Sequence, residues 1–367
     1  LFATVYNCPL IWSTSTEAHW LMLALVDETH NPAYLADMTL AAEPPLTYTQ
    51  RIKQLAFQWT YKIFQYLMAY QKLFGPHVAK KGRVLPPYED VLYNGSLVLS
   101  NSHPSFGPAL KLPANCKEIG GYWIEREPKP LPEVLRDLMD NAQNGVIYFS
   151  MGSIWKSKEM PDSLKQDILK VLSDLQQTVI WKLEEDLPNL PKNIHILKWA
   201  PQRSILAHPN CRLFITHGGP LSISETIFFG VPVIGIPIKY DQRLNIARAV
   251  YKGFAREVEV RYNIADELKL AIQDVLTNNS YQEKAKEVSL IYHDRVVPPG
   301  EELVHWVEHV VKTRGAPHLR SPALLLPWYQ RTHLDLLALI IPILSTLFFV
   351  MITHKFCKKL MSVIQKY

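Results

Sequence analysis

Polar side chains that could bind a nucleotide gather at the ends of two expected strands in the stretch from Trp199 to Gln242. The strands are Arg212–Thr216 and Val231–Ile236, short apolar runs with β-branched residues. His217-Gly218-Gly219 follows the first strand, and Asp241-Gln242 follows the second after a short polar turn. Because ligands of open α/β sheets bind at the carboxyl ends of the strands, we expect these residues to share one site.

The Gly-Gly turn leads into a helix expected over Pro220–Phe229, with proline at its first turn and Gly230 at its end. The unpaired N–H groups and the positive dipole of a helix N-terminus suit a phosphate or pyrophosphate. His217 adds a donor beside this turn and Ser222 adds a hydroxyl. Glu225, one turn further on, could accept two hydrogen bonds from a ribose diol.

Four further residues complete a nucleotide-sugar pocket. Trp199 could stack on a base, Gln202 follows in the adjacent turn, and Asp241 with Gln242 suits sugar hydroxyls. Each of these residues alone has an ordinary structural explanation, since single motif matches are often accidental. Their order along the chain is what makes the pocket the better interpretation.

The series Trp-x-Pro-Gln, Thr-His-x-Gly, Glu before Gly-Val-Pro, and Asp-Gln resembles the signature of the UDP-glycosyltransferase family. In particular it looks like an animal member of the UDP-glucuronosyltransferase and UDP-glucosyltransferase type, and more like the invertebrate ones. The resemblance extends from about Pro9 to Gln330. It implies an α/β fold of the GT-B type, with two Rossmann-like domains, the first of them incomplete, and a C-terminal transmembrane helix.

The resemblance also assigns roles to residues that match the signature. Trp199 matches the residue that stacks on uracil, Glu225 the residue that holds the ribose, and Asp241 and Gln242 the pair that holds the sugar. The implied UDP-sugar-binding residues are Ser153, Trp199, Gln202, His217, Gly219, Ser222, Glu225, Asp241 and Gln242. No cofactor and no metal are expected. Two departures are Pro220-Leu221, where relatives often carry asparagine, and Lys182, where many carry arginine.

Length and composition bound the class of protein. The chain has 367 residues, 48% of them apolar, which suffices for two domains. Its net charge of +5 is scattered apart from the C-terminal tail, so nothing indicates a nucleic-acid partner. The four cysteines lack metal-ligand spacing: a Cys8–Cys116 disulfide is one alternative, and Cys211 is expected to be a core thiol.

The chain divides at a charged, proline-rich segment around Glu125–Pro132. We expect a partial acceptor-binding domain over 1–125, a linker and lead-in helix (Leu131–Asn141) over 126–145, and a UDP-sugar-binding domain, a doubly wound sheet, over 146–334. Further expected strands are Pro9–Ser13, Tyr88–Leu92, Ser96–Leu99, Val146–Ser150, Thr178–Leu183, Ile194–Trp199 and Ala255–Val260. Further expected helices are Gln50–Phe74, Asp162–Gln177, Arg243–Tyr251, Ala265–Thr277, Tyr281–Asp294 and Glu301–Thr313. Gln50–Phe74 is interpreted as a packing helix, with contact to an apolar acceptor as the alternative.

An uncharged run, Leu336–Thr353, is long enough to span a membrane within the expected transmembrane segment 335–353. The basic tail 354–367 then faces the cytosol, so the globular part is lumenal and the protein is a single-pass type I protein. The resemblance places it in the endoplasmic reticulum membrane. Asn94 and Asn278 are possible glycosylation acceptors on this topology.

The function implied is inverting transfer of a hexose from a UDP-sugar to a hydroxyl of a small lipophilic acceptor. The Leu221-Ser222 variant of the phosphate turn resembles the invertebrate members, which mostly use UDP-glucose, so the resemblance favours glucose over glucuronic acid. The base histidine and its partner aspartate are expected upstream of Leu1, and neither His19 nor Asp27 matches their motif. The chain as given is therefore expected to bind donor without transferring it. The alternatives are a non-catalytic, membrane-anchored partner of complete transferases, in a homo- or hetero-oligomer, and, less favoured, a nucleotide-sugar epimerase.

Overall fold

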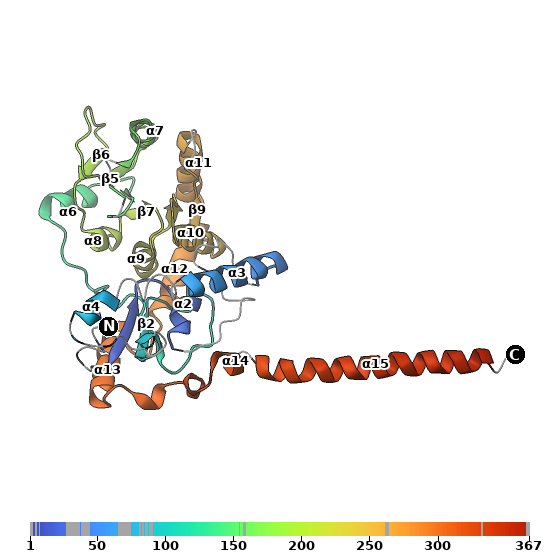
Figure 1. Ribbon diagram of the computed structural model, residues 1–367. Helices are drawn as coiled ribbons and strands as arrows, with labels where there is room; N and C mark the ends of the chain where they lie inside the picture. Colours follow the sequence, from blue (N-terminus) through green and yellow to red (C-terminus); the bar gives the residue numbers. More distant parts are fainter. Residues whose placement is uncertain are drawn as a thin grey trace.

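The computed structural model contains two parallel β-sheets, a helical return segment and one long C-terminal helix (Figure 1). It describes residues 8–26, 45–64, 75–80, 91–153, 159–260, 264–331 and 333–364, with residues 3, 6, 37, 82, 84, 87, 155 and 156. Asp27 and the expected helix beyond Phe64 lie outside the described residues.

The larger sheet has six strands in the order β6-β5-β4-β7-β8-β9, all parallel. The strands are β4 (Val146–Ser150), β5 (Thr178–Lys182), β6 (Ile194–Leu197), β7 (Cys211–Thr216), β8 (Val233–Gly235) and β9 (Ala255–Glu257). β4 and β7 lie at the centre and are apolar almost throughout, because helices cover both of their faces. This arrangement confirms the expected doubly wound sheet.

Two helices, α7 (Asp162–Ser173) and α11 (Ile264–Thr277), cover one face of the six-stranded sheet. The other face is covered by five helices: α6 (Glu133–Asp140), α8 (Gln202–Leu206), α9 (Pro220–Phe229), α10 (Gln242–Tyr251) and α12 (Ser280–His293). α9 ends at Gly230 in the left-handed conformation, φ 66°, which glycine adopts without a steric penalty. The carboxyl ends of β6, β7 and β8, which precede α8, α9 and α10, therefore lie along one edge of the sheet.

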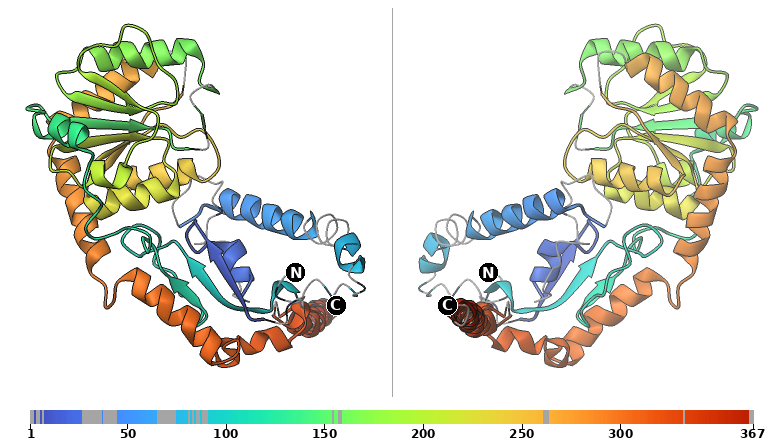
Figure 2. Two further views of the ribbon diagram at one scale, coloured as in Figure 1. Left: turned by 90° about the vertical axis from the view of Figure 1, so that its left-hand side faces the viewer. Right: turned by 90° about the vertical axis from the view of Figure 1, so that its right-hand side faces the viewer.

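The smaller sheet has three parallel strands in the order β1-β2-β3: β1 (Leu10–Thr14), β2 (Gly95–Ser100) and β3 (Cys116–Glu118). A short helix, α2 (Trp20–Ala24), packs on one face. The other face is covered by α13 (Pro299–Lys312) and by Ala316 just beyond it. Figure 2 shows α12 and α13 running along the outside from the six-stranded sheet to the three-stranded one.

Most expected elements are confirmed to within a few residues at their ends, and several predictions are wrong. Val91 and Leu92 are helical, so the expected strand Tyr88–Leu92 does not form there. α7 ends at Ser173 instead of Gln177, and Asp162 is its first residue with Pro161 as the N-cap. Cys8 and Cys116 are separate thiols, whereas Cys211 is buried as expected. Gln202 was expected in a turn, but it is the first residue of α8, a helix that was not predicted.

Helix α3 (Tyr48–Phe64) packs on the body of the protein along one face, as expected. Gln54 and Gln58 are buried on that face, and the Tyr61 ring lies edge-on to Trp20. Ile52, Leu55 and Trp59, part of the expected apolar pattern, are instead exposed by 52%, 44% and 51%.

The C-terminal segment continues through the 3₁₀ turns η3 (Pro317–Leu319) and η4 (Pro322–Leu325) and the short helix α14 (Trp328–Arg331) to α15 (Leu334–Ile364). Within α15, Leu334–Lys355 has a mean hydropathy of 2.6 and none of it is buried. It is long enough to cross a bilayer. The expected apolar helix at the C-terminus is thus present, two residues longer at its start.

Candidate functional site

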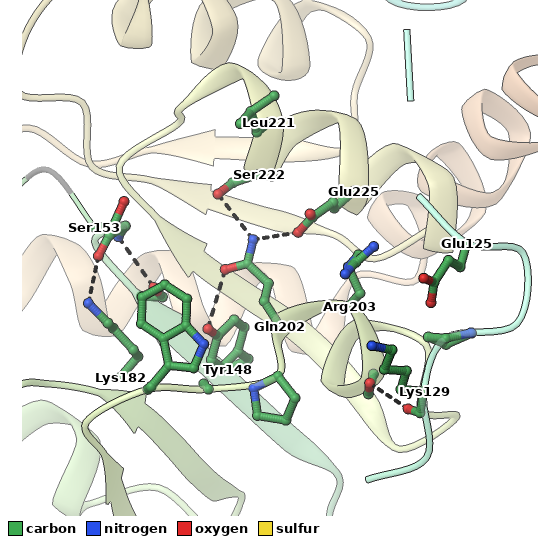
Figure 3. Close-up of a pocket in the computed structure, with 17 residues that line it drawn as sticks. Glu125, Lys129, Tyr148, Ser153, Lys182, Gln202, Arg203, Leu221, Ser222 and Glu225 are labelled. Carbon is green, nitrogen blue, oxygen red and sulfur yellow. Dashed lines mark hydrogen bonds between the residues drawn. The ribbon is translucent and has the colours of Figure 1, made fainter. Parts of the chain in front are cut away.

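A cavity of about 440 Å³ opens at the carboxyl ends of β4, β5 and β6 and beside α8 and α9 (Figure 3). Five of the nine predicted binding residues line it: Ser153, Trp199, Gln202, Ser222 and Glu225. The other lining residues are Glu125, Pro128, Lys129, Tyr148, Ser150, Gly152, Lys182, Ala200, Pro201, Arg203, Ser204 and Leu221. The place of the cavity is the one that parallel α/β sheets use for ligands.

A hydrogen-bond network holds the polar wall of this cavity (Figure 3). The Gln202 side-chain amide donates to Glu225 Oε2 over 2.7 Å and to Ser222 Oγ over 3.2 Å. The Tyr148 hydroxyl, at the centre of β4, donates to Gln202 Oε1 over 3.3 Å. Because both ends of the amide are engaged, its orientation is fixed, and α8 and α9 are tied to the sheet through one side chain.

Glu225 receives a second donor from a distant part of the chain. Trp123, in the loop after β3, donates from Nε1 to Glu225 Oε1 over 3.2 Å. Arg203 Nη1 donates to the backbone oxygen of Trp123 over 2.7 Å, which fixes that loop against α8. Burial raises the pKa of Glu225, and the hydrogen bonds from Gln202 and Trp123 oppose the rise. Each carboxylate oxygen still has a lone pair for a ligand hydroxyl.

His217 lies at the beginning of α9 but does not line the described cavity. Its ring is enclosed by two glycines, since a Cβ on Gly152 or Gly219 would come within 2.5 Å and 2.6 Å of ring atoms. Burial lowers the pKa of His217 to about 4, so the ring is neutral at pH 7 and carries one N–H. Gly219 is therefore needed for the close approach of the histidine, whereas Gly218, with φ 83°, is the residue of this turn that requires glycine.

Trp199 follows β6 and is 76% exposed, so one face of its indole ring is open to the cavity. Lys182, at the end of β5, places its ammonium 5.8 Å from the centre of this ring. The same ammonium donates to the Gly152 backbone oxygen over 2.9 Å and pairs with Glu184. Lys182 thus supports the loop of Gly152 and Ser153 while contributing positive charge to the site.

Asp241 and Gln242 lie beside the cavity instead of in its described lining. Gln242 Oε1 accepts hydrogen bonds from the backbone of Ile238 and Lys239 over 2.9 Å and 3.0 Å. Asn245 donates to Asp241 Oδ2 over 3.3 Å and to the backbone of Gly218 over 3.0 Å. The pair therefore shapes the loop between β8 and α10, and Asn245 ties it to the Gly218-Gly219 turn.

Tyr148, Trp123 and Arg203 belong to this network but were not predicted as site residues. Tyr148 occupies an alternate position of a buried strand, and only its hydroxyl signals a polar contact. Trp123 and Glu225 are 102 residues apart in the sequence, so no local pattern could pair them. The only feature of the sequence that marks Trp123 is its place just after the Gly120-Gly121 turn.

Two other groups bear on the chemistry. His19 is 2% exposed and lies outside the cavity, and burial lowers its pKa to about 4. Over the described part of the chain, no group of three or more His, Cys, Asp or Glu is arranged to hold a metal ion.

Comparison with known proteins gives a consistent result. The family model described as UDP-glucoronosyl and UDP-glucosyl transferase matches residues 3–366. UDP-glucosyltransferase 2 of Dactylopius coccus is 32% identical over 342 residues, 93% of this chain and 66% of that protein. Human UDP-glucuronosyltransferase 2B7 is 29% identical over 358 residues, covering 95% and 66%. UDP-glycosyltransferase UGT5 of Dactylopius coccus is 39% identical over 265 residues, covering 72% and 50%. The chain spans about half to two thirds of the length of these curated relatives.

Two solved structures share the fold. The glycotransferase of kitacinnamycin matches with a TM-score of 0.57 and 17% identity, over 84% of this chain and 72% of that one. The calicheamicin glycosyltransferase CalG4 matches with a TM-score of 0.55 and 16% identity, over 84% and 69%. These likenesses confirm the expected GT-B architecture.

Proposed function

This chain belongs to the UDP-glucoronosyl and UDP-glucosyl transferase family, and on that premise we propose that it supplies the UDP-sugar site of a hexosyltransferase. The reaction is transfer of the hexose to a hydroxyl of a small lipophilic acceptor, with inversion at the sugar carbon. Residues 146–334 would form the donor domain, 1–125 part of the acceptor domain, and 126–145 the connection between them.

The observation that carries the proposal is the Tyr148–Gln202–Glu225 network facing the exposed ring of Trp199 across one cavity. A planar base stacks on an indole ring, and a carboxylate in a fixed position accepts hydrogen bonds from the two hydroxyls of a ribose. The N-terminus of α9, with the glycines around His217, then lies where a diphosphate would bind its backbone N–H groups. Asp241 and Gln242 are assigned to the sugar beyond it.

Glucose is the favoured sugar. Support comes from the relative named UDP-glucosyltransferase 2 and from the Leu221-Ser222 pair of the phosphate turn. The relatives named UDP-glucuronosyltransferases make glucuronic acid the competing sugar, and the two differ by a carboxylate at one carbon. The test below therefore includes both donors.

Inverting transfer needs a group that deprotonates the acceptor hydroxyl. The described lining of the cavity includes no histidine, and His19 is too buried to contact a substrate. The site residues named here hold the donor; they do not remove the acceptor proton.

We assign α15 to a single membrane crossing, with the globular part in the lumen of the endoplasmic reticulum and the basic tail in the cytosol.

Thermal unfolding of the detergent-solubilised chain with UDP, UDP-glucose and UDP-glucuronate, and with ADP as control, tests the donor site. Saturation at a hundred times the dissociation constant should add about 2.7 kcal/mol to the free energy of unfolding. We expect uridine-specific binding that is lost in Trp199→Ala and Glu225→Ala. Absence of binding by every uridine nucleotide would refute the donor site and favour the non-catalytic partner.

A further inference from the structure

Three histidines gather where the end of α13 meets the 3₁₀ turn η3. His305 and His309 are one helical turn apart on α13 and lie on the same face, with their ring centres 6.2 Å apart and their ring planes inclined by 26°. His318 belongs to η3, and its Nε2 lies 3.0 Å from Nε2 of His309. Two imidazole nitrogens thus meet at one point, with a third imidazole one turn away.

The spacing of His309 and His318 suits a pair of side chains that share one ion. Two imidazole nitrogens bound to tetrahedral Zn²⁺ at about 2.0–2.1 Å are about 3.3 Å apart. The observed 3.0 Å between the two Nε2 atoms is close to that separation. The rings of Trp306 and His318 both stand edge-on to His309, with ring centres 5.5 Å and 5.1 Å away, so the His309 ring is held from two sides.

An unusual turn places η3 against the end of α13. Arg314, Gly315 and Ala316 have φ angles of 55°, 106° and 46°, so three successive residues are left-handed and two of them are not glycine. A residue with a Cβ keeps this conformation only where the surrounding structure fixes it. Here the Thr313 hydroxyl donates to the His309 backbone oxygen over 2.7 Å and accepts from the Ala316 N–H over 3.1 Å. The backbone therefore holds the two imidazoles together without help from a ligand.

The third imidazole has room to join the other two. His305 is exposed and lines a second cavity, of about 760 Å³, between β3 and α13, so its side chain can change rotamer. Two histidines spaced i and i+4 on a helix are also the pair that binds Zn²⁺ in the His-Glu-x-x-His motif. Among the described residues no three such side chains already surround one point, so binding of an ion by all three histidines requires His305 to rotate.

We propose that His305, His309 and His318 bind Zn²⁺ or another divalent ion that prefers imidazole, with water as the fourth ligand. None of the three lines the donor cavity, so the ion is assigned a structural role away from sugar transfer. It would fasten η3, the beginning of the segment that leads to α15, to the helix that covers one face of the three-stranded sheet.

Titration of the full, detergent-solubilised chain with Co²⁺ tests the site. The chain carries no polyhistidine tag, its exposed thiols Cys8 and Cys357 are replaced by serine, and bound metals are first removed with EDTA, which is then dialysed away. Co²⁺ in a tetrahedral site absorbs visible light strongly, and its displacement by Zn²⁺ gives the affinity for zinc. Mg²⁺ is the control ion, because it prefers oxygen ligands in octahedral geometry.

We expect one Co²⁺ to bind per chain and to be displaced by Zn²⁺ but not by Mg²⁺. Loss of a residue that only supports a metal ligand costs about 10–100-fold in metal affinity, so loss of a ligand should cost at least about tenfold. His305→Ala, His309→Ala and His318→Ala should each show this loss. His293→Ala is the matched control, because His293 is an exposed histidine at the end of α12 whose Nε2 contacts the Phe228 backbone oxygen, and its loss should leave zinc affinity unchanged.

Failure of the parent chain to bind Co²⁺ would overturn the proposal. Unchanged zinc affinity in any one of the three variants would also overturn it, and so would an equal loss in His293→Ala. Circular dichroism verifies that each variant is folded. UDP-glucose binding is measured on the same samples, and since donor binding and zinc binding use different residues, either can fail without the other.

Discussion

The two parallel sheets differ in which parts of the chain pack on their apolar faces. The six-stranded sheet is covered on both faces by helices that alternate with its own strands, so its core is built from one continuous stretch of chain. The three-stranded sheet depends on Val310 and Ala316, which arrive from beyond the larger sheet and are 1% and 0% exposed. The comparison teaches that the six-stranded sheet, which we propose binds the donor, is covered by helices from its own stretch of chain, whereas one face of the three-stranded sheet is covered by a segment from much later in the chain.

The largest expected effect tests how firmly the two sheets are joined. Arg248 on α10 is 2% exposed and pairs with Glu17, which follows β1. Arg248→Met leaves a partly buried carboxylate without this cation and should lower the free energy of unfolding by about 3 kcal/mol. Arg256→Met is the control, because the Arg256–Asp274 pair is much more exposed and its loss should cost about 0–1 kcal/mol. Equal losses in urea denaturation would show that the Arg248 pair does not stabilise the junction.

The next effect tests the packing of α13 on the three-stranded sheet. Val310→Ala removes two buried methyl groups from the surface that packs on β2 and should cost about 2 kcal/mol of stability. Val311→Ala, at a neighbouring position that is 68% exposed, should have little effect. UDP-glucose affinity should stay unchanged in the folded Val310 variant. A reduced affinity would contradict the independence of the donor side.

The third effect tests the hydrogen bond from Trp123 to Glu225, which joins the loop after β3 to the proposed donor cavity. Trp123→Phe keeps an aromatic ring but removes the bond to Glu225, so UDP-glucose binding should weaken by about 1.5 kcal/mol, roughly tenfold. Trp306→Phe is a matched control, because Trp306 donates to Glu302 on α13, remote from the cavity. Calorimetry gives both affinities, and an unchanged value for Trp123→Phe would remove Trp123 from the site.

The smallest effect is a pH dependence. Burial raises the pKa of Glu225, and donor binding needs the carboxylate, so affinity for UDP-glucose should fall as pH falls through this raised pKa. The loss can reach about tenfold for each pH unit below it. His217, with its pKa lowered to about 4, stays neutral over most of this window. Glu225→Gln should bind weakly at every pH; a parent chain whose affinity stays flat from pH 7 down to 4.5, the ordinary pKa of a glutamate, would mean that Glu225 does not bind the donor as an anion.

The same difference between the sheets explains what the sequence could predict. In the larger sheet, Gly230 and Pro220 mark the ends of α9 locally, and the apolar runs of β4 and β7 leave little ambiguity. Five of the predicted site residues meet in one cavity because they all follow strands of one sheet. The contact of Trp123 with Glu225 could not be predicted, since it depends on how the first sheet docks. The exposure of Ile52, Leu55 and Trp59 on α3 could not be predicted, because helical periodicity identifies an apolar stripe but not what the stripe contacts.

The return of α13 to the three-stranded sheet has a consequence for synthesis on the ribosome. β1, β2 and β3 leave the ribosome early, but one face of their sheet stays uncovered until residues 299–319 have followed. The six-stranded sheet can condense in the meantime, since all of its strands and all of the helices described as covering it precede that segment. The first sheet to be made is therefore the last to be completed, and the apolar α15 emerges almost immediately afterwards. Chaperones that recognise apolar nascent chains would be expected to act during this interval.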